Sequence, residues 1–511
     1  MNSKRIVSDI LFLWLSFSAV LQAQDTLGLE KQTIRLTTIS DLLVSNSSNK
    51  LHSDDPLTIR TKNLPKDALE LNKKYPLWIP LVDVVGINAV INLFDRYVLN
   101  TDYVRISLHS WGNNFRAGWP WGPGWKWDSD AFGNNFLFHP ISGNFYYNAA
   151  RSNGYNFYEA LPITFFGGYM WKIFGENGKP EREDLISTTI SGVFIGEVTY
   201  RLSSVILDDR AIGTERVFRE IGAGLIDPVR AINRLLQGKT SRTTAKEVDQ
   251  KEPLKIRLST GTYLENRDAQ FGTGDVSGIV DIRLDYGDPF EDRTRKPYDF
   301  FKVRTQLDLE KGRVVLNIAS GYGLLYGKNA YPRKLDILAG AFQHWDYYDD
   351  TYFELTAAGF GPGLISRIQL PSNSEFRVDL HVAGVPFGAN TTRLGPYSVA
   401  TRDYDFVGGM EAKLESALDL CDRVRATFKG SFFLTHTYVG NARDNYSKSN
   451  DKFTIVNPGI AFRLYRNLGI GFEHVVYSSN RDPDIYYNTN FKRSEQKLYL
   501  TYYSGTDHRR K

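Results

Sequence analysis

The residues best suited to acid–base or metal chemistry are one histidine and two glutamates. His139 is followed by Glu159 and later by Glu197. A histidine with two carboxylates can bind a metal ion or transfer protons. However, the sequence lacks the H-E-x-x-H or E-x-x-H pairing that would place two ligands on one helix face. His139, Glu159 and Glu197 are therefore catalytic candidates, and the sequence predicts neither a metal site nor a cofactor.

The alternative interpretation is that the same residues form a structural network. Glu159 and Glu197 would pair with Arg151 and Arg201, and Asp184 would join the same polar set, because buried charges need partners in any fold. The sequence contains no G-x-S-x-G nucleophile elbow, P-loop or dinucleotide-binding fingerprint. We favour the structural network, so the sequence leaves enzymatic activity open and leans against it.

A tryptophan-rich segment precedes these residues. Tryptophan suits a membrane interface because its ring is apolar and its N–H needs a polar partner, and it can also stack on a sugar or lipid headgroup. The interpretation we rank first is a rigid Gly/Pro loop packed on the neighbouring helices, with anchoring at a membrane interface next. The residues concerned are Trp111, Trp119, Trp121, Trp125 and Trp127.

Helices must position these side chains. Asp184 is a predicted N-cap, and Asp227 followed by Pro228 predicts the start of a helix that ends at Gly238. Gly192 and Gly196 form a small-x-x-x-small pair that lets helix backbones approach closely. The predicted helices cover residues 81–99, 141–151, 155–174, 184–207 and 228–238.

The segment around His139 resembles an uncharacterised domain family of predicted Gram-negative outer-membrane proteins. The family pattern is H-P-x-x-G-x-x-Y-x-x-A-R-x-x-G, then Glu, then Asp-Leu and Gly-Glu. The resemblance covers about residues 76–240 and implies location and architecture, without an activity. The matching positions are His139, Pro140, Gly143, Tyr146 (or Tyr147), Ala150, Arg151, Gly154, Glu159, Asp184, Leu185, Gly196 and Glu197.

The second half of the chain alternates between apolar and charged residues. Val280, Ile282 and Leu284, for example, alternate with Asp281 and Arg283. A transmembrane barrel wall has this pattern, with apolar residues facing outward and polar residues inward. A soluble β-sandwich gives a similar pattern, but long strands joined by alternating short and long turns favour a barrel.

The number of strands is constrained by parity. We place thirteen strands, starting near residues 255, 276, 300, 313, 333, 351, 364, 375, 403, 423, 452, 468 and 494. An odd number would start the first strand outside the cell, so we expect Tyr103–His109 to supply a further strand. The predicted fold is a membrane β-barrel of about 12–14 antiparallel strands plus an α-helical domain, a candidate plug of the lumen.

The N-terminus has the pattern of a secretory signal peptide. Lys4 and Arg5 precede an apolar run over residues 10–21, and cleavage is expected after Ala23. No other segment resembles an inner-membrane helix, because the best candidate, residues 185–207, contains two charged side chains. The predicted domains are signal peptide 1–23, polar lead-in 24–75, helical Trp/Gly-rich domain 76–238, linker 239–253 and barrel 254–511.

Composition limits the function classes. The net charge of +4, from 62 basic and 58 acidic residues, gives no reason to expect a nucleic-acid partner. A single cysteine excludes an intramolecular disulfide. We expect an outer-membrane protein in contact with lipids, acting in transport or envelope organisation, with protein partners left open. The alternatives are a membrane-embedded enzyme modifying lipid or lipopolysaccharide, and a glycan-binding outer-membrane protein.

Overall fold

The computed structural model describes most of the chain between Lys73 and Ser504. The described residues are 73–120, 122–127, 130–245, 248, 251–266, 271–310, 313–332, 335–350, 353–391, 404–440, 448–483 and 489–504. The predicted signal peptide, the lead-in up to residue 72 and Trp121 lie outside the described residues. Contacts divide the chain into two compact units, a helical unit with residues up to 127 and 139–251, and a barrel unit with residues 130–138 and 252–504.

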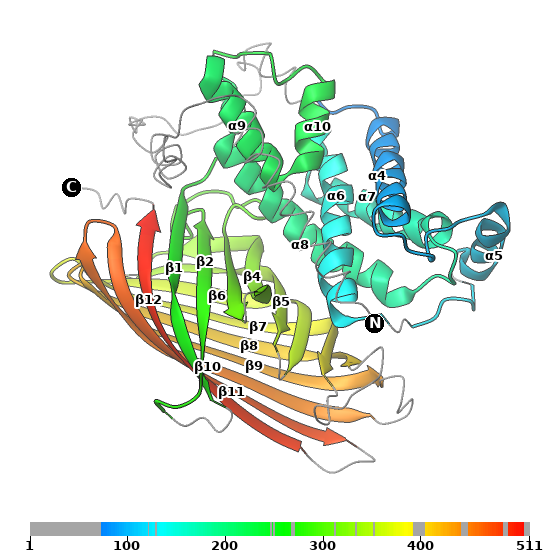
Figure 1. Ribbon diagram of the computed structural model, residues 1–511. Coiled ribbons are helices and arrows are strands. Elements are labelled where there is room, and N and C mark those ends of the chain that lie inside the picture. Colours follow the sequence, from blue (N-terminus) through cyan, green and yellow to red (C-terminus); the bar gives the residue numbers. More distant parts are fainter. Residues whose placement is uncertain are drawn as a thin grey trace. The chain divides into compact units, whose positions relative to one another are not determined.

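Twelve antiparallel strands form a closed barrel, in which β1 pairs with β12 (Figure 1). The closed ring leaves no unpaired edge, which is what a sheet needs to span a membrane. The strands are β1 (Leu254–Asn266), β2 (Asp275–Tyr286), β3 (Phe301–Glu310), β4 (Arg313–Ala330), β5 (Leu335–Asp349), β6 (Glu354–Leu370), β7 (Ser374–Thr391), β8 (Tyr404–Leu420), β9 (Val424–Val439), β10 (Ser449–Tyr465), β11 (Leu468–Pro483) and β12 (Thr489–Ser504).

The predicted even strand number is confirmed, but the route to it was wrong. The strands placed near residues 351 and 364 are one strand, β6, which pairs with β5 from Glu354 to Ile368. Tyr103–His109 is not a strand, because α5 begins at Leu108. Ser107 and Ser110 exchange side chain–backbone hydrogen bonds in a capping box that starts this helix. A local cap thus overrides the short alternating pattern.

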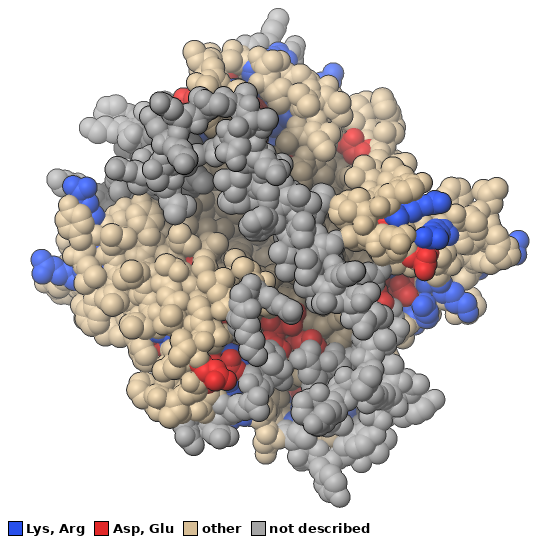
Figure 2. Space-filling model, in the orientation of Figure 1, with Lys and Arg blue, Asp and Glu red and all other residues tan. Residues whose placement is uncertain are grey.

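The predicted charged inner face of the barrel is confirmed by ion pairs that cross the lumen. Arg283 on β2 lies 2.7 Å from Glu473 on β11, and Arg481 on β11 lies 2.7 Å from Asp405 on β8. Neither pair of strands is adjacent in the ring, so these side chains meet inside the barrel. In contrast to these buried charges, leucines that face outward are exposed, and Leu498 on β12 is an example. Charged side chains are also sparse on the described surface seen in Figure 2.

The barrel has two mouths with different connections. The mouth where β1 begins and β12 ends, the terminal mouth, also carries turns at residues 371–373, 421–423 and 466–467. The opposite mouth joins β7 to β8 and β9 to β10 through longer stretches of sequence, but it also joins β3 to β4 through only two residues. Tight turns therefore occur at both mouths, so the expected alternation of short and long turns is only partly met.

A longer loop between β2 and β3, residues 287–300, is an exception at the terminal mouth. The loop is held by Arg295, whose guanidinium donates hydrogen bonds to the carbonyl oxygens of Asp288, Pro289 and Glu291. The Arg367 guanidinium lies 4.2 Å from the centre of the Phe290 ring. These contacts pack the loop against the barrel.

The helices agree with most of the sequence-based expectations. Asp227 caps α10 by accepting a hydrogen bond from the Arg230 backbone N–H, with Pro228 at the first position, as predicted. The predicted N-cap at Asp184 is wrong, because α8 begins at Arg182. Helices α5 and α9 were not predicted. The helices are α4 (Trp78–Tyr97), α5 (Leu108–Gly118), η3 (Asn134–Phe138), α6 (His139–Ser152), α7 (Phe157–Met170), η4 (Trp171–Gly175), α8 (Arg182–Ile206), α9 (Gly213–Ile226) and α10 (Pro228–Leu236).

Glycines let α6 and α8 pack closely. A Cβ atom on Gly192 would lie 2.6 Å from the Gly143 Cα, so a larger residue would force the helices apart. One turn further along α8, a Cβ on Gly196 would lie 2.6 Å from the Tyr147 ring. This close contact brings the polar residues of α6 and α8 within hydrogen-bonding distance.

One described helix, α4, is long and apolar enough to cross a membrane by length and composition. Only 17% of its most apolar window is buried. Val82, Val90 and Leu93 are among its exposed side chains.

Candidate functional site

His139 lies in a buried cluster of charges at the start of α6. Its Nε2 atom is 3.1 Å from the Asp184 carboxylate, which also pairs with Lys172. The Lys172 ammonium lies 2.9 Å from Glu176 and 3.0 Å from Glu181. Glu159 and Glu197 do not belong to these contacts.

The charges of this cluster depend on one another. Burial alone would lower the pKa of His139, but the attraction and hydrogen bond of Asp184 outweigh it and raise the pKa above its usual value. Burial would raise the pKa of Asp184, yet His139 and Lys172 hold it well below its usual range. His139 is therefore stabilised as an imidazolium beside a carboxylate, which suits an ion pair better than a general base.

Glu197 lies in a second buried cluster, between two arginines. Its carboxylate is 2.7 Å from Arg151 Nε and 2.7 Å from Arg201 Nε, and it accepts a hydrogen bond of 2.6 Å from the Tyr147 hydroxyl. Burial would raise the pKa of Glu197, but Arg151 and Arg201 lower it below its usual value. The carboxylate is thus held in its ionised form with both oxygens occupied.

Glu159 differs from the other two candidates because it is on the surface. It forms a capping box with Asn156 at the start of α7, and its carboxylate lies 2.8 Å from Lys74. The expected pairing of Glu159 with an arginine in a buried network is therefore wrong, since the side chain is 38% exposed. Among the described residues, no group of three or more His, Cys, Asp and Glu side chains could hold a metal ion.

The described tryptophans are partly engaged within the helical unit. Trp125 is buried and donates a 2.8 Å hydrogen bond to the Gly118 carbonyl. Trp111 donates a 2.8 Å hydrogen bond to the Phe174 carbonyl. Trp119 is 57% exposed, and its ring stacks on that of Phe115 at 5.3 Å. Trp127 is half-buried.

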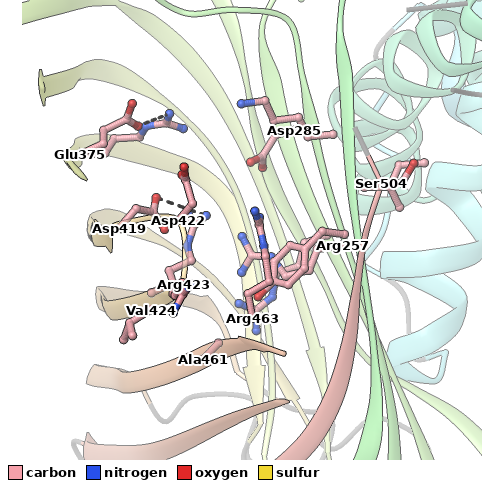
Figure 3. Close-up of a pocket in the computed structure, with 16 residues that line it drawn as sticks. Arg257, Asp285, Glu375, Asp419, Asp422, Arg423, Val424, Ala461, Arg463 and Ser504 are labelled. Atoms are coloured by element: carbon pink, nitrogen blue, oxygen red, sulfur yellow. Dashed lines mark hydrogen bonds and ion pairs between the residues drawn. The ribbon is translucent and has the colours of Figure 1, made fainter. Parts of the chain in front are cut away.

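A cavity of about 90 Å³ lies inside the terminal mouth of the barrel (Figure 3). We call it the basic pocket, because seven basic and four acidic side chains line it. No sequence pattern indicates this pocket, because its residues come from strands that are far apart in the sequence. The basic side chains are Lys255, Arg257, Arg283, Arg377, Arg423, Arg425 and Arg463, and the acidic ones are Asp285, Glu375, Asp419 and Asp422.

A second cavity, of about 130 Å³, lies next to the basic pocket in the lumen. The two cavities share Arg257, Arg283, Asp285 and Arg425 in their walls. The two cavities are therefore adjacent, and these four charged side chains lie between them. Ion pairs such as that between Lys302 and Asp379 line the second cavity.

An apolar cluster crosses the lumen beyond the second cavity. Tyr477 belongs to both the cavity wall and the cluster. Ile318 and Phe453 also belong to the cluster, and they come from β4 and β10, which face each other across the ring. We call this set the lumen cluster; it comprises Ile318, Tyr348, Phe353, Leu355, Ala357, Val385, Phe433, Phe453, Val475 and Tyr477. The alternating pattern predicts a charged inner face, and this apolar layer is an addition to it.

Residues 130–138 belong to the barrel unit, although they lie between segments of the helical unit in sequence. Phe136 packs against Phe387, Tyr404 and Phe406, with ring centres 5.5–6.2 Å apart. Asp405 points into the lumen, so its neighbours Tyr404 and Phe406 face outward. Protein therefore covers this part of the outer barrel wall.

Comparisons with solved structures find outer-membrane barrels. The outer membrane channel DcaP of Acinetobacter baumannii has 8% identity and a TM-score of 0.23, over 49% of this chain and 96% of that chain. The NanC porin has 8% identity and a TM-score of 0.26, over 49% of this chain and 98% of that chain. The outer membrane phospholipase A from Escherichia coli has 12% identity and a TM-score of 0.24, over 48% of this chain and 92% of that chain. At these scores the matches carry no argument about this chain.

No curated protein matches the sequence. Residues 124–229 match the family model of a domain of unknown function, DUF3943. The predicted resemblance to an uncharacterised domain family is confirmed, over a shorter range than expected. The closed ring of twelve strands, with its apolar outer wall and charged lumen, has the architecture of a bacterial outer-membrane barrel. The chain is thus an outer-membrane β-barrel protein in which residues 124–229 match the model of a domain of unknown function.

Proposed function

We propose that the barrel carries small polar solutes across the outer membrane through its lumen. The observation that carries the proposal is the pair of adjacent cavities in the lumen, whose walls share the charged side chains of Arg257, Arg283, Asp285 and Arg425. A barrel with only a structural role could fill this space with packed side chains. Lumen side chains of this kind select solutes by charge and size.

The lumen cluster is proposed as the closed gate of this path. Its aromatic and aliphatic side chains from strands on both sides of the ring leave little room for hydrated solutes. Hydrophobic constrictions gate membrane pores by excluding water. Phe353 and Phe453 are the gate residues to change first, because neither takes part in a lumen ion pair.

The test is solute entry into liposomes that contain the purified full-length protein, measured by liposome swelling. Because the gate is closed in this proposal, a Phe353→Ala/Phe453→Ala variant is measured beside the natural protein. Faster swelling with the variant than with protein-free liposomes supports transport. Failure of both proteins to admit any solute would overturn transport and favour a role in envelope organisation.

For the helical unit we propose that the charged clusters hold helices together and do not catalyse a reaction. His139 and Glu197 lie in separate ion-pair networks, and the Glu197 carboxylate is fully occupied by Arg151, Arg201 and Tyr147. A lipid-modifying enzyme would need an acid and a base at one reacting bond. The geometry therefore supports a structural role for Arg151, Asp184 and Arg201.

The proposal also includes a role of the helical unit as a plug of the barrel. In outer-membrane vesicles, a plug would shield residues 80–238 from protease until the barrel is unfolded by heat. Cleavage in this range while the barrel still shows its folded gel mobility would remove the plug and leave the barrel proposal intact.

A further inference from the structure

We infer that the basic pocket binds a small soluble anion through Arg257, Arg423 and Arg463. The inference names the solute class of the transport function proposed above and rests on that function. The pocket lies where β1, β12 and the β8–β9 turn meet, at the terminal mouth (Figure 3). Its ligand would be a molecule with carboxylate or phosphate oxygens.

Some of the pocket's basic side chains have acidic partners. Arg283 pairs with Asp281 and Glu473, each at 2.7 Å, and Arg377 pairs with Glu375 at 2.8 Å. Arg425 lies 3.7 Å from Asp419, and its buried Nε has no hydrogen-bond partner. These ion pairs neutralise only part of the positive charge of the basic pocket.

Arg257, Arg423 and Arg463 are different. Among the described residues, no carboxylate lies within ion-pair distance of their guanidinium groups, which come from β1, the β8–β9 turn and β10. Like charges gathered in a partly enclosed site repel one another, and the repulsion is relieved when an anion binds between them. The excess of arginine at this mouth is therefore the feature that points to a ligand.

An aromatic ring holds two of these arginines. The guanidinium carbons of Arg257 and Arg463 lie 5.9 Å and 5.4 Å from the centre of the Tyr503 ring. Stacking on an aromatic face orients a guanidinium and leaves its N–H groups free to donate. Tyr503 thus positions both groups beside the cavity without occupying their hydrogen-bond donors.

The chemistry of arginine identifies the ligand. The guanidinium fork donates two parallel hydrogen bonds to a carboxylate or phosphate, and these charge-assisted bonds are stronger than neutral ones. The pocket faces the lumen, whereas lipid would contact the outward-facing side chains, so a water-soluble anion fits better than a lipid headgroup. Basic residues lining a pore also favour anions over cations.

The test uses the full-length protein in detergent, titrated calorimetrically with inorganic phosphate and, separately, with succinate at constant ionic strength. Binding of either anion is expected, and the stronger one identifies phosphate or carboxylate as the preferred group. Arg423→Gln/Arg463→Gln should weaken binding by about a hundredfold, roughly tenfold for each arginine. Arg466→Gln is the matched control, since Arg466 lies in the neighbouring turn and does not line the pocket.

Heat-modified gel mobility first establishes that each variant retains its folded barrel. Loss of binding in the folded double variant, with binding retained in Arg466→Gln, supports the site. Absence of phosphate and succinate binding to the natural protein, or equal binding by the double variant, would overturn it. Solute entry is measured separately, so a protein that binds the anion but admits no solute would refute transport without refuting the site.

Discussion

Arg283 and Glu473 form a 2.7 Å ion pair between β2 and β11, which are not neighbours in the barrel. Glu473 also accepts hydrogen bonds from Asn457 at 3.0 Å and Tyr499 at 3.1 Å. Arg283 and Glu473 are both buried. The pair therefore joins separate parts of the barrel wall through the lumen.

Arg283→Leu should destabilise the barrel by about 3–5 kcal/mol, because it leaves the Glu473 carboxylate buried without its cation. The measurement is the temperature at which the folded barrel unfolds, seen on gels as the change from the mobility of the folded protein to that of the heated protein. Arg466→Leu, at an exposed turn position, should leave this temperature unchanged. An equal temperature for Arg283→Leu and the natural protein would contradict the account.

Glu197→Gln should destabilise the helical unit by about 3 kcal/mol, because it leaves Arg151 and Arg201 without their shared carboxylate. Glu159→Gln should have a much smaller effect, since Glu159 is on the surface. Urea unfolding followed by tryptophan fluorescence measures both. Unchanged stability of Glu197→Gln with loss of a lipid-modifying activity would instead support an enzyme.

The stability of the helical unit should fall as the pH rises above the ordinary pKa of histidine, 6.5. The folded state raises the pKa of His139, so its imidazolium contributes full stability below pH 6.5 and loses it as the pH passes the folded value. Burial opposes protonation, as does Lys172, but Asp184 outweighs them. His139→Gln should remove this fall between pH 6 and pH 9. A fall of the same size in the variant would assign it to other groups.

Asp227→Asn should stabilise the helical unit at pH 7 by about 1–2 kcal/mol. Burial raises the pKa of Asp227 to about 6, so the stability that its protonated form contributes is lost as the pH rises through that value. Asparagine is an equally good N-cap and carries no charge to bury. The two proteins should unfold at the same urea concentration at pH 3.5. Lower stability of the variant at pH 7 would show that the attraction between Asp227 and Arg230 dominates.

The barrel could be predicted because its signals are local. The alternation over residues 280–285 predicts which side chains face inward, and the ion pair between Arg283 and Glu473 on a non-adjacent strand confirms it. Strand ends were less predictable: the break placed between residues 351 and 364 is absent, because β6 continues through its glycines. The capping box at Ser107 starts a helix inside a segment whose apolar–polar alternation also fits a strand. The two sequence patterns overlap there, so the choice between helix and strand was less predictable.

The candidate sites were less predictable because they depend on distant residues. Pairing of Glu197 with Arg151 and Arg201 follows from charge and burial, and the sequence anticipated it. The partner of Glu159 was not anticipated, since Lys74 lies far away in sequence. The residues of the basic pocket and of the lumen cluster come from strands that meet only when the ring closes. No short sequence pattern therefore predicts them.

The measurement that tests the central claim most directly is ion conductance in planar lipid bilayers. The natural protein should show little current, because the lumen cluster closes the path. Phe353→Ala/Phe453→Ala should raise the conductance at least about tenfold, whereas Phe432→Ala, on the outward face of β9, should not change it. An equally low conductance of the folded double variant and the natural protein would contradict a gated solute path through the barrel.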